Sequence, residues 1–119
     1  MSIELNEPAL RHARALVRAG DVVRDERDDW SEAVPTAQEE NDFIEREGWT
    51  AFSHWHLGID RDADPETKQA YSFPYGDFTK VHRSGVISAE SRAGQYDHDD
   101  IEAALRKLLD LIDKDQDKD

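Results

Sequence analysis

The aromatic residues of this chain are confined to its middle. All ten (three Trp, three Tyr and four Phe) lie between Trp30 and Tyr96 of a 119-residue sequence. Aromatic side chains bury large areas and dominate the energetics of a small core. A chain of this length is expected to form one domain, whose core can hold it together without disulfide bonds or metal. The distribution therefore predicts a core supplied by the middle of the chain, with helices packed around it.

Two helices are predicted in the N-terminal half. The first spans residues 7–19, where Leu10, Ala13 and Val17 recur at helical spacing and form one apolar stripe. The second opens with a capping box made by Thr36 and Glu39 and ends near residue 47, before a glycine.

The segment between these helices, residues 21–35, has no sustained hydrophobic period. It is too polar to form a core element, but it carries Trp30. We therefore expect an extended arm across the surface, with Trp30 as its anchor.

The central segment predicts a small β-hairpin. Residues 49–60 fit either a helix or a strand, whereas Tyr71, Phe73 and Tyr75 alternate as in a strand. The expected pairing is residues 55–59 against 70–74. The residues Phe73-Pro74-Tyr75-Gly76 fit a type I turn after the second strand.

Two further helices are predicted in the C-terminal part. Residues 84–93 carry Gly85, Ala89 and Ala93 every fourth position, which leaves a face with almost no side chains, suited to close approach by another helix. The last helix is expected to be capped by Asp97. It has the clearest apolar stripe of the chain: Ile101, Leu105, Leu108 and Ile112.

These elements together predict an α+β fold. We expect a mostly helical single domain with a small β-hairpin over residues 1–114. The acidic residues 115–119 contain nothing apolar to bury and are expected to be disordered.

The charge of the chain limits its partners. The formal net charge is −13, so duplex nucleic acid and anionic membranes would repel it. Three explanations of the acidity stay open: a solvated surface of a high-G+C actinobacterial or halophilic protein, a surface for a cationic protein partner, or a mimic of nucleic-acid charge. There is no cysteine, signal-peptide run or membrane span, so a cytoplasmic protein is the expectation.

Histidines provide the first candidate site. His54 and His56 would share one face of a strand and could bind a metal, with His82 or His98 as the third ligand. The alternative is that they are ordinary hydrogen-bonded or surface residues around a tryptophan. No cofactor is predicted.

The start of the helix after residue 83 provides the second candidate. The residues Lys80, His82, Arg83 and Ser84 crowd a helix N-terminus, where backbone N–H groups favour a small anion. Asp77, His82, Ser84 and Ser88 include the residue types of a hydrolase, but no nucleophile motif or oxyanion hole accompanies them. We therefore predict that the protein is not an enzyme.

Part of the sequence resembles known families. The stretch from Tyr71 to Gln95, followed by "DIEAALRKLLDLID", resembles the C-terminal half of small acidic proteins of actinobacteria and related microbes, a family without an assigned function. More loosely, it is similar to a segment of tailed-phage head and protease proteins. The positions that match that segment are Tyr71, Pro74, Asp77, Ile101, Glu102, Ala104, Leu108, Leu109, Ile112 and Asp113.

The resemblance implies structural motifs and brings no catalytic residue. The sequence therefore predicts a non-catalytic interaction or accessory protein with a possible protein partner. The alternative is a protein that binds a metal or a small anion through its histidines.

Overall fold

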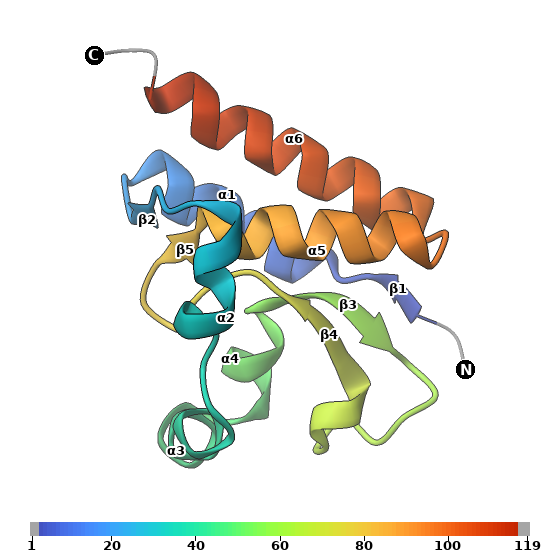
Figure 1. The fold of residues 1–119 in the computed structure, drawn as a ribbon. Coiled ribbons are helices and arrows are strands. Elements are labelled where there is room, and N and C mark those ends of the chain that lie inside the picture. Colours follow the sequence, from blue (N-terminus) through green and yellow to red (C-terminus); the bar gives the residue numbers. More distant parts are fainter. Residues whose placement is uncertain (1–2, 117–119) are drawn as a thin grey trace.

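A computed structural model describes residues 3–116 of the chain, which form a mostly helical α+β fold (Figure 1). The helices are α1 (Glu7–Arg18), α2 (Trp30–Ala33), α3 (Ala37–Glu47), α4 (Trp49–Ser53), α5 (Arg83–Gln95) and α6 (Asp99–Gln116). The strands are β1 (Ile3–Leu5), β2 (Val22–Val23), β3 (His56–Asp60), β4 (Tyr71–Pro74) and β5 (Val81–His82), with 3-10 turns at Arg27–Asp29 and Lys68–Ala70. This confirms the predicted fold class.

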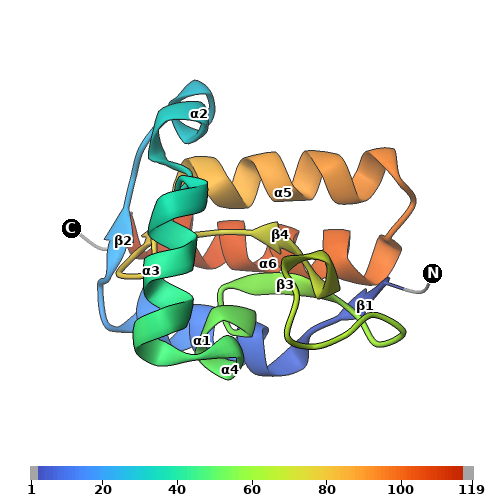
Figure 2. The same ribbon diagram turned by 90° about the horizontal axis from the view of Figure 1, so that it is seen from below.

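Helices α5 and α6 lie side by side above a small antiparallel sheet (Figures 1 and 2). The order of the sheet is β1-β3-β4, so β3 is central and β4 is an edge strand. A second, two-stranded sheet pairs β2 with β5 in parallel. None of the helices in the described part of the chain is long and apolar enough to cross a membrane.

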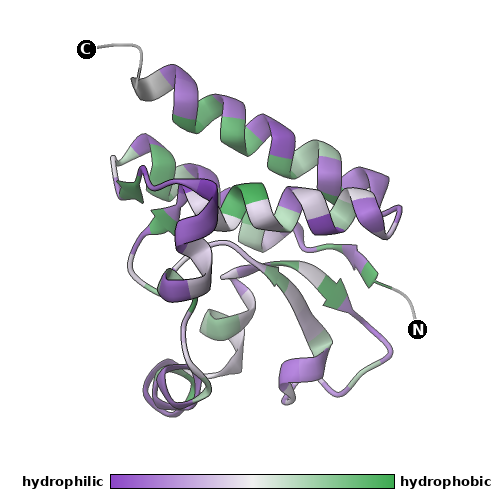
Figure 3. Ribbon diagram, viewed as in Figure 1, coloured by the Kyte–Doolittle hydropathy of each residue, from purple (hydrophilic) through white to green (hydrophobic). Residues whose placement is uncertain are grey.

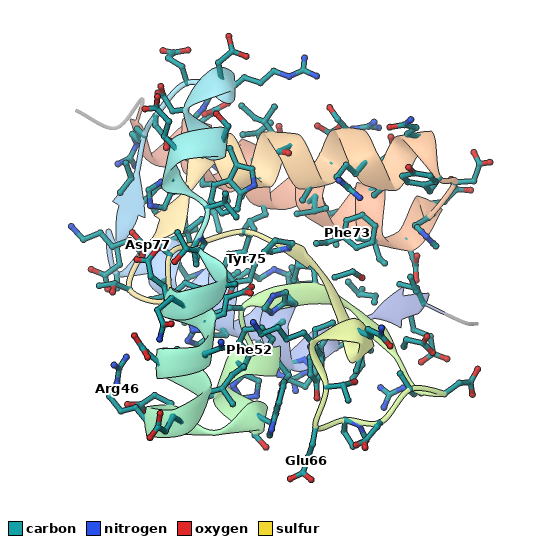
Figure 4. All side chains as sticks on the ribbon, turned by 60° about the horizontal axis from the view of Figure 1, so that its bottom comes forward. Arg46, Phe52, Glu66, Phe73, Tyr75 and Asp77 are labelled. Carbon is teal, nitrogen blue, oxygen red and sulfur yellow. The ribbon has the colours of Figure 1, made fainter. Side chains whose placement is uncertain are left out.

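The core combines central aromatics with the predicted stripe of α6. Tyr75 and Phe52 are almost fully buried, and Figure 4 shows both inside the molecule. The stripe residues Ile101, Leu105, Leu108 and Ile112 are at most 1% exposed. Polar and apolar residues alternate along α6 in Figure 3, as expected for a helix with one buried face.

The predicted hairpin is confirmed. Strand β3 pairs with β4 in antiparallel register, with Gly58 opposite Ser72. Residues 49–60, which fitted either a helix or a strand, contain one of each: α4 ends at Ser53 and β3 begins at His56. Strand β1 pairs with the other edge of β3 and has no counterpart in the sequence prediction.

The type I turn predicted at residues 73–76 is wrong. Phe73 has a positive φ of 59°, but the strand continues through Pro74, and Gly76 forms a β-bridge with Val81. The chain reverses over the next residues instead. There the carboxylate of Asp77 accepts hydrogen bonds from the backbone N–H groups of Thr79 and Lys80, as in a side-chain-stabilised turn.

Two boundaries near the C-terminus also differ from prediction. Asp97 has a positive φ of 61° and precedes the helix, whereas the carbonyl of His98 accepts the first helical hydrogen bond from Glu102. Helix α6 extends to Gln116, two residues into the segment expected to be disordered. The other three residues of that segment, 117–119, lie outside the described residues.

The arm before α3 lies on the surface as predicted, and it has more regular structure than expected. It contains β2, a 3-10 turn and α2, none of which has a fully buried residue. Trp30 is its anchor. A Cβ atom placed on Gly85 would lie 2.9 Å from the Trp30 ring, so the indole lies directly on the backbone of α5. The sequence predicted close approach by another helix along this face, and at Gly85 the close neighbour is a single indole ring.

Candidate functional site

A groove of about 720 Å³ runs between α5, β4 and the arm. Its walls come from segments far apart in the sequence. The lining residues are Ile3, Trp30, Val34, Ser72, Phe73, Pro74, Ser88, Ala89, Arg92, Tyr96 and His98. Tyr96 is 58% exposed and is the most exposed large apolar side chain of the described residues. An exposed aromatic at the rim of an apolar groove is typical of a binding surface.

Small side chains on α5 leave the groove open. The Trp30 ring packs on Gly85 and Tyr96 follows the last residue of α5, so Ser88 and Ala89 lie between them along the helix. Larger residues at these two positions would fill the space above the sheet. The run of small residues that was predicted to admit a helix therefore forms one wall of a groove at Ala89.

The other long wall of the groove is the edge strand β4. Its residues Ser72, Phe73 and Pro74 line the groove, and within the described residues its only strand partner is β3. Figure 2 shows β4 between β3 and α5, so its unpaired edge lies on the α5 side of the sheet. An unpaired edge presents backbone C=O groups, and N–H groups at every residue except Pro74, that a further strand could bind.

A second pocket of about 550 Å³ adjoins the groove at its arm end. Trp30, Ser88 and Arg92 line both hollows. The remaining residues of the second pocket are polar: Arg27, Asp28, Ser31 and Ser91. The two hollows therefore form one surface with an apolar part and a polar part.

Two of the residues predicted to bind an anion, His82 and Ser84, lie beside this arm. His82 is only 7% exposed and lies between two carboxylates. Its Nδ1 is 2.9 Å from Oδ2 of Asp25, and its Nε2 is 2.7 Å from Oδ2 of Asp77. Carboxylates only accept hydrogen bonds, so both ring nitrogens must carry protons. His82 is therefore an imidazolium ion held between two anions.

The electrostatics of the cluster agree with this protonation state. Burial by itself lowers the pKa of His82, but its hydrogen bonds to Asp25 and Asp77 and their charges outweigh burial and raise the pKa above the ordinary value. For the two carboxyl groups burial acts in the opposite direction and raises the pKa. Hydrogen bonds, from His82 above all, outweigh that effect and lower the pKa of both Asp25 and Asp77.

An internal carboxylate occupies the N-terminus of α5. Oδ1 of Asp25 accepts from the backbone N–H of Ser84 at 2.8 Å, and its Oδ2 accepts from the Ser84 hydroxyl at 2.8 Å. The sequence reasoning correctly identified the position as favourable for an anion, since helix N-termini favour negative charge. It did not identify Asp25, which lies 59 positions away from Ser84.

The other two predicted anion-binding residues point elsewhere. Arg83 forms an ion pair with Asp113 of α6 at 2.8 Å. Lys80 is exposed on the turn that follows Asp77. Figure 4 shows Asp77 at the edge of the molecule. The predicted set of four is therefore split: His82 and Ser84 share Asp25, and Arg83 and Lys80 do not join them.

The same contacts bear on the hydrolase residue types. Asp77, His82 and Ser84 do lie together, but the Ser84 hydroxyl donates to Asp25 rather than to His82. His82 has no free ring nitrogen to accept a proton. Ser88 lies in the groove, apart from this cluster. The arrangement connects the arm, the 76–81 turn and α5, and it presents no activated nucleophile.

The structure places the predicted metal ligands in separate surroundings. His56 is buried, and Nδ1 of its ring lies 2.9 Å from the carbonyl oxygen of Phe52. Burial lowers the pKa of His56 to about 4, so this ring is neutral. His82 lies in the carboxylate cluster, and His98 lines the groove. Residues 3–116 contain no group of three or more His, Asp or Glu side chains that could hold a metal ion.

His54 instead lies beside His12 of α1, with ring centroids 5.9 Å apart. The buried Tyr75 hydroxyl donates to the His54 carbonyl at 2.7 Å and lies 2.9 Å from Nδ1 of His12. Because the hydroxyl proton is used on that carbonyl, Nδ1 of His12 must donate to Tyr75. These contacts attach α1 and the end of α4 to the strand segment.

Sequence reasoning missed two of the residues that build the site. Asp25 is one of several acids in a polar arm, and nothing in its spacing marks it as a partner of His82. Arg92 is one of two arginines of α5, and nothing in its spacing marks it as a residue of the groove. Trp30 was the one usable signal, because a lone tryptophan in a polar segment indicates an anchor.

Comparison of the chain with protein-family models, with curated proteins and with solved structures finds no match. The resemblance to small acidic actinobacterial proteins and to a phage segment therefore stays a prediction. The function has to be argued from the groove and the clusters around it.

Proposed function

We propose that this protein is a non-catalytic cytoplasmic interaction module that binds an extended segment of a partner protein in the groove between α5 and β4. The observation that carries the proposal is the unpaired edge of β4 beside an open groove. Addition of a strand to an exposed sheet edge is a recurring mode of peptide recognition. Main-chain hydrogen bonds then supply affinity, and pockets for side chains supply specificity.

The walls of the groove suit a peptide side chain. Trp30, Phe73 and Tyr96 come from three different segments and provide aromatic surface around the small residues of α5. Aromatic side chains are enriched at the energetically dominant positions of protein interfaces. An apolar side chain of the partner would contact these rings while its backbone pairs with β4.

The polar clusters support a non-catalytic role. His82, Asp25 and Ser84 satisfy one another, and Arg83 is paired with Asp113. A general base or nucleophile needs a free lone pair directed at a substrate, and these groups use theirs within the protein. The net charge of −13 disfavours nucleic acid as the partner, because phosphate binding requires cationic surface.

The test is capture of a partner from the native host with a variant that fills the groove. Ser88→Arg introduces a long charged side chain between the two walls, whereas Thr50→Arg places the same side chain on the exposed face of α4, away from the groove. We expect a protein captured by the wild type and by Thr50→Arg to be lost with Ser88→Arg. Capture that is unaffected by Ser88→Arg, in a variant with normal circular dichroism and melting, would contradict the proposal.

A further inference from the structure

The polar pocket beside Trp30 extends the groove and determines which chemical group it can accept. It shares Trp30, Ser88 and Arg92 with the groove, so a segment lying along β4 reaches the pocket without leaving the surface. A ligand that occupies both hollows must carry an apolar group in one and a polar group in the other.

Hydrogen-bond donors dominate the polar pocket. Arg27 and Arg92 contribute guanidinium groups, and Ser88 and Ser91 contribute hydroxyls. The Ser31 hydroxyl donates to the backbone carbonyl of Asp28. Nη2 of Arg27 donates to the Ser91 hydroxyl at 3.5 Å, so the arginine extends from the arm toward α5. A guanidinium has five donors and no acceptor. The donors of this pocket therefore favour a ligand that only accepts hydrogen bonds, which is an oxyanion.

The two arginines are free to bind such a group. The chain has 28 acidic residues, and Arg46, Arg61, Arg83 and Arg106 all form ion pairs with some of them. In the described part of the chain Arg27 and Arg92 form no ion pair, and both are exposed. Within residues 3–116, Arg11, Arg14, Arg18 and Arg24 form none either, so it is their shared place in the pocket that distinguishes Arg27 and Arg92. A guanidinium pairs in bidentate geometry with carboxylates and phosphates.

The acid in the pocket selects between these two oxyanions. Asp28 is the only acidic lining residue, so two arginines and one aspartate leave a formal charge of +1. A carboxylate carries one negative charge and matches this value, whereas a phosphate monoester carries nearly two at neutral pH. We propose that the partner segment carries an Asp or Glu side chain, bound by Arg27 and Arg92, next to an apolar side chain bound between Trp30 and Phe73.

This inference rests on the proposed function of the groove, and it specifies the chemistry of the partner. The overall charge of the protein opposes an acidic segment at long range. Exposed charges farther apart than about 8–10 Å are largely screened at physiological salt, whereas a contact ion pair is screened less. The local pair can therefore select an acidic residue in a segment that is neutral overall.

The experiment is selection of random peptides displayed on phage against the full chain, with the bulky, uncharged variant Ser88→Phe as counter-selection. Enriched peptides are then synthesised in three forms that differ at one residue: the acid, its amide, and phosphoserine. We expect enriched peptides to pair an apolar residue with an acid. The amide form should bind about tenfold more weakly, the loss that one charge-assisted hydrogen bond represents.

Protein variants test whether Arg27 and Arg92 bind the acidic residue of the peptide. Arg92→Gln and Arg27→Gln should each weaken binding of the acidic peptide about tenfold and leave binding of the amide peptide unchanged. Arg18→Gln, an exposed arginine at the end of α1, is the matched control and should change neither. Each variant should have the melting temperature of the wild type, since exposed arginines contribute little to stability. This is checked before binding is compared.

The outcomes separate the two proposals. The carboxylate inference alone would be overturned by peptides whose binding is lost on substitution of Ser88 but which contain no acid. Peptides that bind the arginine variants as tightly as the wild type would overturn it too. Tighter binding of the phosphoserine form would replace the carboxylate by a phosphate. A selection that yields no peptide sensitive to Ser88→Phe would overturn the interaction function and this inference with it.

Discussion

At the scale of single residues, His82 links two segments that are distant in the sequence. Its two ring nitrogens join Asp25 of the arm to Asp77 of the turn after β4. Removing one partner of a buried ion pair leaves an uncompensated charge and typically costs about 3–5 kcal/mol. The cluster also attaches the part of the arm that carries Trp30, whose ring lies 5.9 Å from the His82 ring. One wall of the groove therefore depends on a titratable residue.

The protonation of His82 predicts a pH dependence of stability. The folded-state pKa of His82 is raised above its ordinary value of 6.5, so its stabilising effect is fully present below that pH. The effect is lost as the pH rises through the folded-state pKa, because a neutral ring can donate to only one carboxylate. The measurement is the free energy of unfolding of the wild type and of His82→Gln between pH 6 and pH 9.

The difference between the two proteins should be largest at pH 6 and shrink toward pH 9. The difference isolates His82 from His12 and His56, whose pKa values are lowered by burial and whose effects have the opposite sign. A difference that stays constant over this range would contradict an imidazolium at position 82. His98→Gln, which leaves the carboxylate cluster intact, serves as the control.

At the scale of elements, α6 and α5 form the frame on which the groove is built. Helix α6 buries one face completely, whereas α5 has a buried face made of small residues. The amphipathic stripe explains why α6 was predictable from sequence. The arm has no such stripe and is attached by Trp30, by the contacts of Asp25 and by the pairing of β2 with β5, so its position depends on few interactions.

The burial of α6 predicts a large effect of one leucine. Leu105→Ala should lower the free energy of unfolding by about 2–5 kcal/mol, because the side chain is fully buried and its removal leaves a cavity. Lys107→Ala, two positions along on the exposed face, should change it by less than about 0.5 kcal/mol. Urea denaturation measures both. Equal midpoints for Leu105→Ala and the wild type would contradict the packing of α6.

At the scale of the whole molecule, the acidic surface opposes the compact state. Folding concentrates a net charge of −13 within a radius of gyration of 13.5 Å. Self-repulsion of this kind destabilises a folded protein while keeping it dispersed. The surface ion pairs compensate little, because exposed pairs contribute about 0–1 kcal/mol each.

This repulsion predicts that salt stabilises the protein. Raising sodium chloride from about 0.01 M to about 1 M shortens the Debye length from about 30 Å to about 3 Å and screens the repulsion between surface carboxylates. The melting temperature should therefore rise with salt, and calorimetry at fixed pH measures it. Sodium and potassium chloride should act alike. A melting temperature that falls with salt would show that the surface ion pairs outweigh the net charge.

The amino-acid sequence by itself determined the elements whose signals are local. The stripe of α6, the capping box at Thr36 and the alternation of Tyr71 and Phe73 each depend on neighbours within a few residues, and each was confirmed. The turn at Pro74 and the cap at Asp97 were wrong, because pairing of Gly76 with Val81 and the backbone of His98 overrode local preference.

The tertiary structure alone decided the site. His82 and Ser84 were recognised as neighbours of an anion, but the anion is Asp25, which comes from a different segment. The groove likewise needs Trp30, β4 and α5 to meet, and Trp30 is separated from the other two by dozens of residues. Sequence spacing indicates contacts within one element. A hydrogen bond between distant segments forms only when the whole chain folds. The entropy lost in closing the loop between those segments is compensated only when the core packs.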